Sequence, residues 1–156
     1  MRDFTTRSAS FVTWASRKVA LTSATAIILL GGALGANIAH AQLPPSQHYN
    51  QIEYVSGGIG IDESTAFKQA MSQFPLALTF AENRGATAAY VSDVQVVIRN
   101  EKGDTVLNAD ANGPYFLVRL PAGSYKISAT YKNKTVSQTA NVGKKGSTRA
   151  MFEWPE

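Results

Sequence analysis

Residues 113–131 read GPYFLVRLPAGSYKISATY, and this stretch decides the fold. Apolar side chains occupy every second position on both sides of the central Pro-Ala-Gly: Phe116, Val118 and Leu120, then Tyr125, Ile127, Ala129 and Tyr131. Successive side chains of a strand point to opposite faces, so this alternation predicts two strands with one buried face each. Pro121 presets φ for the first turn position, and Gly123 accepts the backbone that closes the turn. We therefore expect a β-hairpin here.

The segments around this stretch predict further strands. Alternating or apolar runs occur at residues 49–55, 76–80, 94–98, 105–108, 135–142 and 148–154. Turn-forming residues separate several of them, including Asn100–Asp104 and Lys132–Lys134. Short strands at this spacing predict a mainly β fold, a β-sandwich of about seven strands. We expect residues 51–156 to form a single domain, which is large enough to bury one core.

One helix is expected near the start of this domain, at about residues 63–74. Apolar residues spaced three, four and seven apart form one helical face: Phe67, Ala70, Met71 and Phe74. Pro75 would end the helix, and Asp62 or Ser64 could cap its start. Since strands dominate the rest of the chain, we expect the helix to be an addition at one edge or end of the sandwich.

The N-terminal segment, residues 1–41, resembles a secretory signal peptide. A basic region ends at Arg17-Lys18, an apolar run follows, and the run closes on Ala39-His40-Ala41. This pattern predicts cleavage between Ala41 and Gln42 and export by the general secretory route to the periplasm or the medium. The alternative is a retained membrane anchor, because roughly 18–20 apolar residues can span a bilayer. Residues 42–50, which contain Pro44-Pro45, are predicted to be a flexible leader.

Charge and cysteine content exclude several classes of protein. The formal net charge is +4, but residues 1–41 hold four basic residues and one acidic residue, which leaves +1 on residues 42–156. A domain of so little net charge is not expected to bind nucleic acid. The chain has no cysteine, so disulfides and a lipid-modified cysteine anchor are both excluded.

The chain offers few residues for catalysis or metal binding. His48 is the one histidine after position 41, and it lies in the expected leader. A metal site or a Ser-His-Asp set would need more such ligands brought together. Asp104, Asp110 and Asn112 lack the spacing of a calcium-binding loop and are typical of turns. We expect no enzymatic activity, no metal and no cofactor.

The glycine loop before the expected helix is the candidate interaction site. It is formed by Gly57, Gly58, Gly60, Asp62 and Glu63. A phosphate-binding loop can also precede a helix, but this one lacks the dinucleotide-binding spacing and the lysine of a P-loop. Its two acidic residues would repel an anion. A structural turn is therefore the simplest interpretation, with protein binding as the functional hypothesis.

The pattern Gly113-x-Tyr115-x-Leu117-x-x-Leu120-Pro121-x-Gly123-x-Tyr125-x-Ile127-x-Ala129 resembles carboxypeptidase regulatory-like domains. Val94-x-Val96-x-Ile98-x-x-x-x-Gly103 fits their opening hairpin, and the resemblance covers residues 91–154. It implies a transthyretin-like (prealbumin-like) β-sandwich that is not itself catalytic and that accompanies enzymes, transporters or surface proteins. Residues 54–80 resemble those of small secreted proteobacterial proteins that carry such a domain. Because a fold does not determine a function, the resemblance assigns no activity.

Two functions of different classes follow from these observations. The first is a non-catalytic accessory module that binds an envelope protein through an exposed strand edge or the Gly57–Glu63 loop. The second is a module for small ligands, such as a carbohydrate or another envelope compound, which would need aromatic side chains outside the core. The candidates for that role are Tyr115, Tyr125, Tyr131 and Trp154, although a place in the core or at a sheet edge explains them better. A transthyretin-like hydrolase would need clustered His, Arg and Ser side chains, which His48 alone supports poorly.

Overall fold

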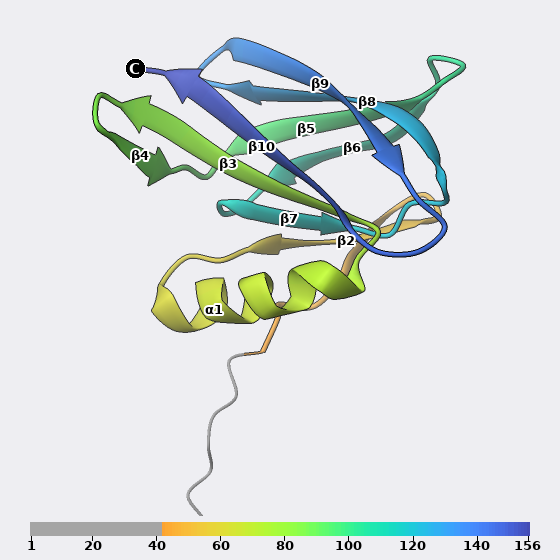
Figure 1. Ribbon diagram of the computed structural model, residues 1–156, viewed down its shortest axis with the longest axis horizontal. Coiled ribbons are helices and arrows are strands. Elements are labelled where there is room, and N and C mark those ends of the chain that lie inside the picture. The colour runs from red at the N-terminus through yellow and green to blue at the C-terminus, as the bar shows by residue number, and fades with distance from the viewer. Residues whose placement is uncertain (1–41) are drawn as a thin grey trace, which may run out of the picture. The chain divides into compact units, whose positions relative to one another are not determined.

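The computed structural model describes residues 42–156, which form two β-sheets and one α-helix (Figure 1). The first sheet has the strand order β1-β2-β7-β3-β10, and β4 also pairs with β3. Its strands are β1 (Gln47–Tyr49), β2 (Ile52–Gly57), β3 (Leu76–Arg84), β4 (Thr87–Tyr90), β7 (Tyr115–Val118) and β10 (Thr148–Pro155). The second sheet has the order β6-β5-β8-β9. Its strands are β5 (Val94–Asn100), β6 (Thr105–Ala111), β8 (Gly123–Tyr131) and β9 (Lys134–Val142).

The mainly β character with one α-helix agrees with the sequence prediction. The described residues form ten strands where about seven were expected, partly because β1 lies mostly in the segment predicted to be a leader and β4 lies outside the predicted strands. The predicted signal peptide, including Ala41, lies outside the described residues. No helix in residues 42–156 is both long enough and apolar enough to cross a lipid bilayer.

The main hydrophobic core lies between the two sheets. Alternate residues of each sheet point into it, as the period of two requires. Leu78, Phe80 and Phe152 come from the first sheet, and Ile98 and Ile127 come from the second; all five are fully buried. The alternation at residues 94–98 and 125–131 therefore identified the inward faces of β5 and β8 correctly.

The hairpin predicted at Pro121–Gly123 is wrong, because β7 and β8 belong to different sheets. The intervening residues, 119–122, carry the chain from the first sheet to the second. The Tyr125 hydroxyl donates a hydrogen bond of 2.9 Å to the Pro121 carbonyl and fixes this crossing. Pro and Gly serve a change of sheet as well as they serve a hairpin turn, so local chemistry does not distinguish the two. The hairpins β5–β6 and β8–β9 form as predicted.

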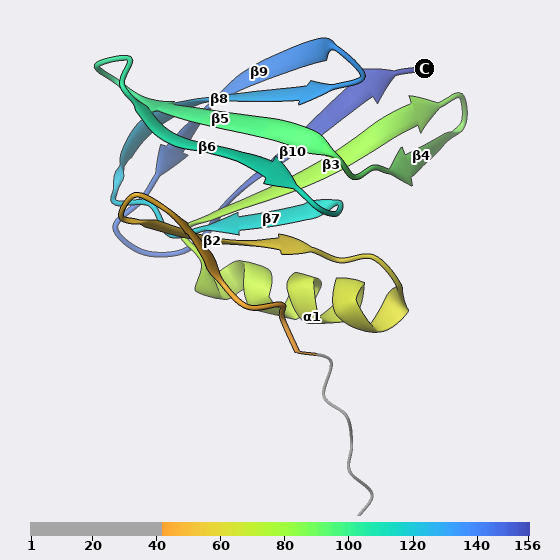
Figure 2. The same cartoon turned by 180° about the vertical axis from the view of Figure 1, so that it is seen from behind.

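Helix α1 (Ile61–Ala70) continues into a 3₁₀ turn, η1 (Met71–Gln73), and covers the outer face of the first sheet. Figures 1 and 2 show it alongside β2 and β7, so it is not an addition at an edge or end. Its apolar face joins a second core: Val55, Phe67, Ala70, Met71, Phe74, Ala77, Tyr115 and Leu117. As a result all four residues of β7 are buried, between the main core and the helix. The helix begins at Ile61, and neither Asp62 nor Ser64 caps it, because Gly60 occupies the cap position without a side-chain bond.

The last strand, β10, pairs in parallel with β3, from Thr148 opposite Leu76 to Pro155 opposite Asn83. The Trp154 indole N–H donates a hydrogen bond of 2.8 Å to the Lys134 carbonyl of β9. The Gln138 side chain likewise donates to the Met151 carbonyl. These side-chain bonds join the edge strands of the two sheets, so they occupy backbone groups that edge strands otherwise leave free.

The segment predicted as a flexible leader is partly structured. Its residues 47–49 form β1, which pairs with β2, and the Tyr54 hydroxyl donates a hydrogen bond of 3.0 Å to the Gln47 side chain. Leu43 packs against the core beneath α1. The prediction failed because a polar, proline-containing segment carries no local sign of a pairing partner further along the chain.

Candidate functional site

The glycine loop lies directly on two aromatic rings. Phe67 of α1 and Tyr115 of β7 are stacked, with ring centroids 5.9 Å apart. Gly58 has φ +95°, and a Cβ atom there would collide with the Tyr115 ring. A Cβ atom on Gly57 would meet the Phe67 ring and the Glu63 carboxylate. These two glycines therefore let the backbone approach the aromatic pair closely, which is a structural role.

Two isoleucines of this loop project into solvent. Ile59 is 65% exposed and Ile61 is 84% exposed. Tyr90, at the end of β4, is 57% exposed, and its ring lies 5.6 Å from that of Tyr115. Gly58 and Tyr90 thus contact the same buried tyrosine, which places the loop beside β4. We call Ile59, Ile61 and Tyr90 the apolar end surface.

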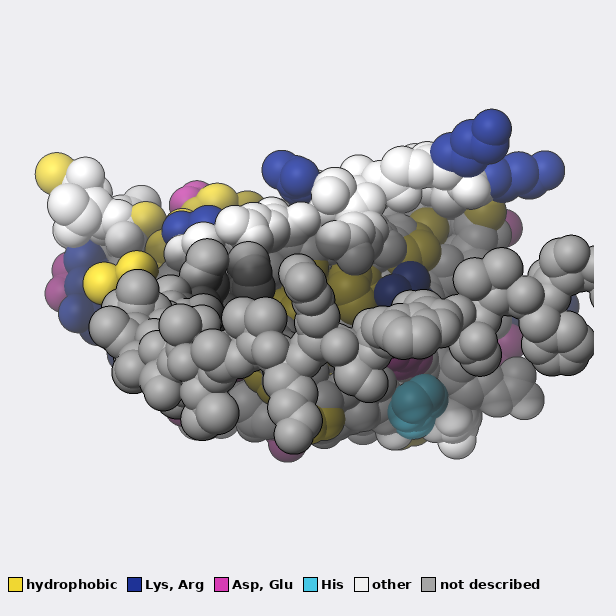
Figure 3. Space-filling view, turned by 90° about the horizontal axis from the view of Figure 1, so that it is seen from below, with side chains coloured by type: hydrophobic (Ala, Val, Ile, Leu, Met, Phe, Trp, Pro, Cys, Tyr) yellow, Lys and Arg dark blue, Asp and Glu magenta, His cyan; other side chains and the backbone are white. Residues whose placement is uncertain are grey.

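The figures agree with this placement. Figures 1 and 2 both show β4 and the turn into α1 at the same end of the two sheets. In Figure 3, hydrophobic side chains reach the surface toward the left of the view, the end at which Figure 1 shows β4, and charged side chains lie next to them. The described residues have one other large exposed hydrophobic side chain, Met151 of β10, which is 44% exposed.

Acidic residues flank the apolar end surface. Asp62 and Glu63 lie in the first turn of α1, where the positive end of the helix dipole favours negative charge. Neither of them forms an ion pair with another residue of the described chain. The surface therefore combines exposed apolar groups with two carboxylates that have no ion-pair partner in the described chain.

A hollow of about 400 Å³ separates the glycine loop from leader residues 44–47. Ser56, Gly57 and Glu63 form part of its wall. Ser56 is buried, and its hydroxyl oxygen accepts a hydrogen bond of 2.8 Å from the Asn112 amide. The polar groups of this wall thus also hold β2 and the β6–β7 turn together.

The Tyr115 hydroxyl lies buried beneath the apolar end surface and has no hydrogen-bond partner within the described chain. Burial raises the pKa of this hydroxyl well above its ordinary value of 10, and the nearby Tyr90 adds to the effect. The group therefore stays neutral at physiological pH. Burying a hydroxyl without a hydrogen bond costs free energy, so the hydrogen-bonding capacity of Tyr115 is left unsatisfied at this end of the protein.

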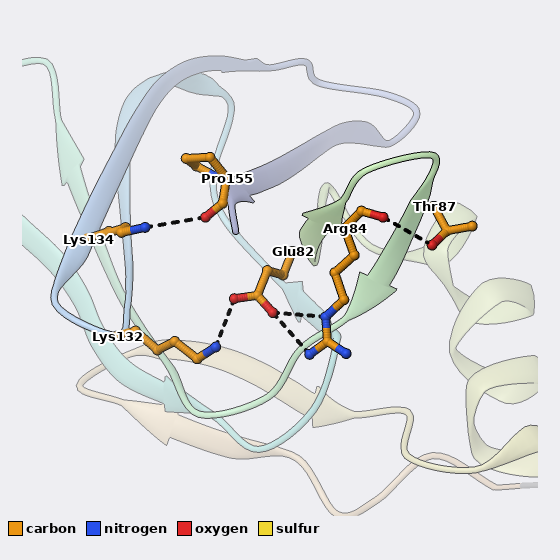
Figure 4. A network of polar contacts seen from close by, with 6 residues as sticks. All are labelled: Glu82, Arg84, Thr87, Lys132, Lys134 and Pro155. Atoms are coloured by element: carbon orange, nitrogen blue, oxygen red, sulfur yellow. Dashed lines mark hydrogen bonds and ion pairs between the residues drawn. The ribbon is translucent and has the colours of Figure 1, made fainter.

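A charged cluster at one end of the main core was not foreseen from the sequence (Figure 4). Glu82 of β3 is buried, and it accepts hydrogen bonds from Lys132 at 2.8 Å and from Arg84 at 3.1 and 3.2 Å. The Lys132 hydrogen bond, followed by that from Arg84, lowers the pKa of Glu82. Since Lys132 lies in the β8–β9 turn, the cluster links the two sheets. Extending the alternation of Leu76, Leu78 and Phe80 by one step would have placed Glu82 on the buried face.

The residues considered for metal binding or sugar stacking have other roles. Residues 42–156 contain no group of three or more His, Asp or Glu side chains placed to hold a metal ion. The Asp104 carboxylate accepts a hydrogen bond from Asn100 within the β5–β6 turn. Tyr115, Tyr125 and Trp154 are buried, so they offer no exposed face for a carbohydrate ring.

Comparison with models of known protein families gives no match, and comparison with curated proteins finds no relative. The fold and the surfaces described above are therefore the basis for a functional proposal.

Proposed function

We propose that the protein is an exported, non-catalytic module that binds a partner protein of the cell envelope through the apolar end surface. The observation that carries this proposal is the exposure of Ile59, Ile61 and Tyr90 together at one end. Exposed apolar patches on soluble proteins commonly mark sites of protein interaction. Export to the periplasm is supported by the pattern of residues 1–41.

The chemistry of the surface indicates what kind of partner it suits. Burying a large apolar side chain contributes about 1.5–3 kcal/mol, and aromatic residues are enriched among interface hot spots. The exposed side chains of Ile61 and Tyr90 can provide such contacts. Because Asp62 and Glu63 lie beside them without ion pairs, the matching partner surface is apolar with basic residues around it.

We assign the fold, within the same proposal, to the transthyretin-like β-sandwiches of carboxypeptidase regulatory-like domains. Two sheets around one core and the hairpins β5–β6 and β8–β9 support this assignment. So does the Gly113–Ala129 sequence pattern. Domains of that family act as accessory modules, which is consistent with a binding role.

Affinity capture with matched variants tests the proposal. Residues 42–156 are immobilised, exposed to envelope extracts under mild crosslinking, and compared with the double variant Ile59→Ser/Tyr90→Ser. Met151→Ser serves as the control, because it also removes an exposed hydrophobic side chain, but from β10. We expect the wild type and the control to retain one partner that the double variant loses. Once that partner is purified, its affinity for the wild type and the control should be similar, and its affinity for the double variant should be lower. A partner that binds all three equally, or no specific partner, would refute the proposal.

The hollow beside the leader favours a second candidate, the binding of a small ligand. Its volume of about 400 Å³ is within the range typical of small-molecule sites, and Ser56 and Glu63 supply polar groups. A ligand that binds the native state must raise the melting temperature. A thermal-shift screen of sugars and cell-wall fragments, repeated with Glu63→Gln, would detect it; a shift that the variant retains would place the ligand elsewhere.

A further inference from the structure

A row of polar residues crosses the outer face of the second sheet. Arg99 of β5 lies opposite Lys126 of β8, and Thr105 of β6 and Thr139 of β9 continue the row on either side. The neighbours of Arg99 and Lys126 along their strands, Ile98 and Ile127, point into the core, so the two basic side chains face outward. The row therefore places two positive charges side by side between two hydroxyl groups.

This arrangement is unfavourable for the sheet by itself. Like charges directly opposite each other on neighbouring strands destabilise the pair. Neither Arg99 nor Lys126 forms an ion pair with another residue in the part of the chain that the structure describes. Glu101 lies near them but outside ion-pair distance of both. The two positive charges thus have no ion-pair partner within the described residues.

The same residues line a hollow of about 370 Å³. Arg99, Lys126, Ser124 and Thr139 contribute to its wall, together with the β5–β6 turn. The wall thus combines a guanidinium, an ammonium and two hydroxyls, all of which can donate hydrogen bonds into one space, and the carboxylate of Glu101 also lines it.

A β-bulge adjoins Arg99. The register with β6 shifts between Ile98 and Arg99: Ile98 lies opposite Leu107, whereas Arg99 lies opposite Thr105, and Val106 is the extra residue. Bulges bend the strand locally, redirect side chains and are over-represented next to functional sites. The irregularity lies in β6, on the side of Arg99 away from Lys126.

We propose that this hollow is a binding site for a phosphoryl group. The planar guanidinium of Arg99 matches two oxygens of a phosphate, Lys126 adds a point charge, and the hydroxyls of Ser124 and Thr139 serve the remaining oxygens. A phosphate dianion bound between the two cations attracts both of them, and these attractions offset the repulsion between the cations. The hollow is larger than one phosphate ion, so the phosphoryl group belongs to a small organic phosphate or to a phospholipid headgroup.

Titrations with defined probes test the site and distinguish the two sources. The protein is titrated at low salt with inorganic phosphate, with glycerol phosphate, and with vesicles of phosphatidylglycerol or of phosphatidylcholine, and amide chemical shifts are followed. We expect shifts at residues 99, 124, 126 and 139. Binding of glycerol phosphate identifies a soluble ligand, and binding only to phosphatidylglycerol vesicles identifies a headgroup. If no probe shifts these amides, the proposal is overturned.

Variants that remove one charge distinguish specific binding in this hollow from non-specific attraction of anions to the protein. Arg99→Gln and Lys126→Gln should each weaken binding on the order of tenfold, because each removes a charge-assisted hydrogen bond. Glu101→Gln should tighten binding, because it removes a nearby negative charge. Lys68→Gln, on helix α1 over the first sheet, removes the same charge from the other sheet's outer face and should leave binding unchanged. Equal weakening by Lys68→Gln and Arg99→Gln, or weakening by Glu101→Gln, would contradict the proposal.

Stability provides a readout that does not depend on the ligand's identity. In phosphate-free buffer at low salt, Arg99→Gln or Lys126→Gln should raise the melting temperature, because each relieves the repulsion. Added phosphate should stabilise the wild type and not the variants. A lower melting temperature in both variants would show that the two charges do not repel each other, and the basis of the proposal would be lost.

Discussion

Replacement of Phe67 by alanine tests whether α1 is an integral part of the fold. The Phe67 side chain is completely buried between α1 and the first sheet and is stacked on Tyr115. Removing a buried phenylalanine side chain costs about 3–5 kcal/mol, to which the lost aromatic pair contributes. Small domains have about 5–15 kcal/mol of unfolding free energy in total, so this variant would lose a large part of it. At about 4 °C per kcal/mol, the melting temperature should fall by roughly 12–20 °C.

The measurement is urea and thermal unfolding of residues 42–156, followed by far-ultraviolet and aromatic circular dichroism. Ile61→Ala is the control on the same helix, because that side chain is 84% exposed and its loss should change stability by less than about 0.5 kcal/mol. Both signals of Phe67→Ala should shift together in one transition. If instead the helix signal is lost first and the sheets unfold at the wild-type midpoint, α1 is an appendage and the reasoning is refuted.

Two further predictions concern the glycine loop and the charged cluster. Gly60→Ala, whose Cβ meets no atoms, should cost about 1–3 kcal/mol for its positive φ alone. Gly58→Ala should cost more than Gly60→Ala, because its Cβ also collides with the Tyr115 ring; equal losses in urea unfolding would contradict this. Glu82 has a lowered pKa in the folded state, so its stabilisation is complete above its ordinary pKa of 4.5 and is lost as the pH falls through the lower folded value. When the free energy of unfolding is measured as the pH is lowered, the values for the wild type and Glu82→Gln should therefore converge at low pH. A difference in unfolding free energy that stays constant with pH would refute the role of this carboxylate.

Local patterns in the sequence predicted most of the second sheet. The β8–β9 turn places Lys132 and Asn133 at positive φ, which two-residue hairpin turns require, and alternation in β8 identified its inward residues. Two of its three pairings, β5–β6 and β8–β9, join sequence neighbours, so alternation and turn residues carry enough information for them; the pairing of β5 with β8 is not local.

The first sheet could not be derived in this way, because its pairings β2–β7, β3–β7 and β3–β10 join distant segments. Tyr115 and Leu117 of β7 were expected to alternate with a buried set, yet they are buried as well, beneath α1. A period of two identifies one inward face and does not reveal that a helix covers the other. For the candidate surface, the interaction role of the Gly57–Glu63 loop stays a prediction, and no pattern in the sequence indicated Tyr90, whose place depends on the contact of β4 with Tyr115.

The parallel pairing of β3 with β10 affects the order in which the chain can fold. Until residues 148–155 have been synthesised, one edge of β3 has no partner, and Phe80 lacks the rings of Phe152 and Trp154 beside it. Pairing between such distant segments closes a long loop, which slows folding. A chain cut short before Thr148 would expose that strand edge and an open core, and both promote aggregation. Completion of this fold therefore waits for the last strand to be made.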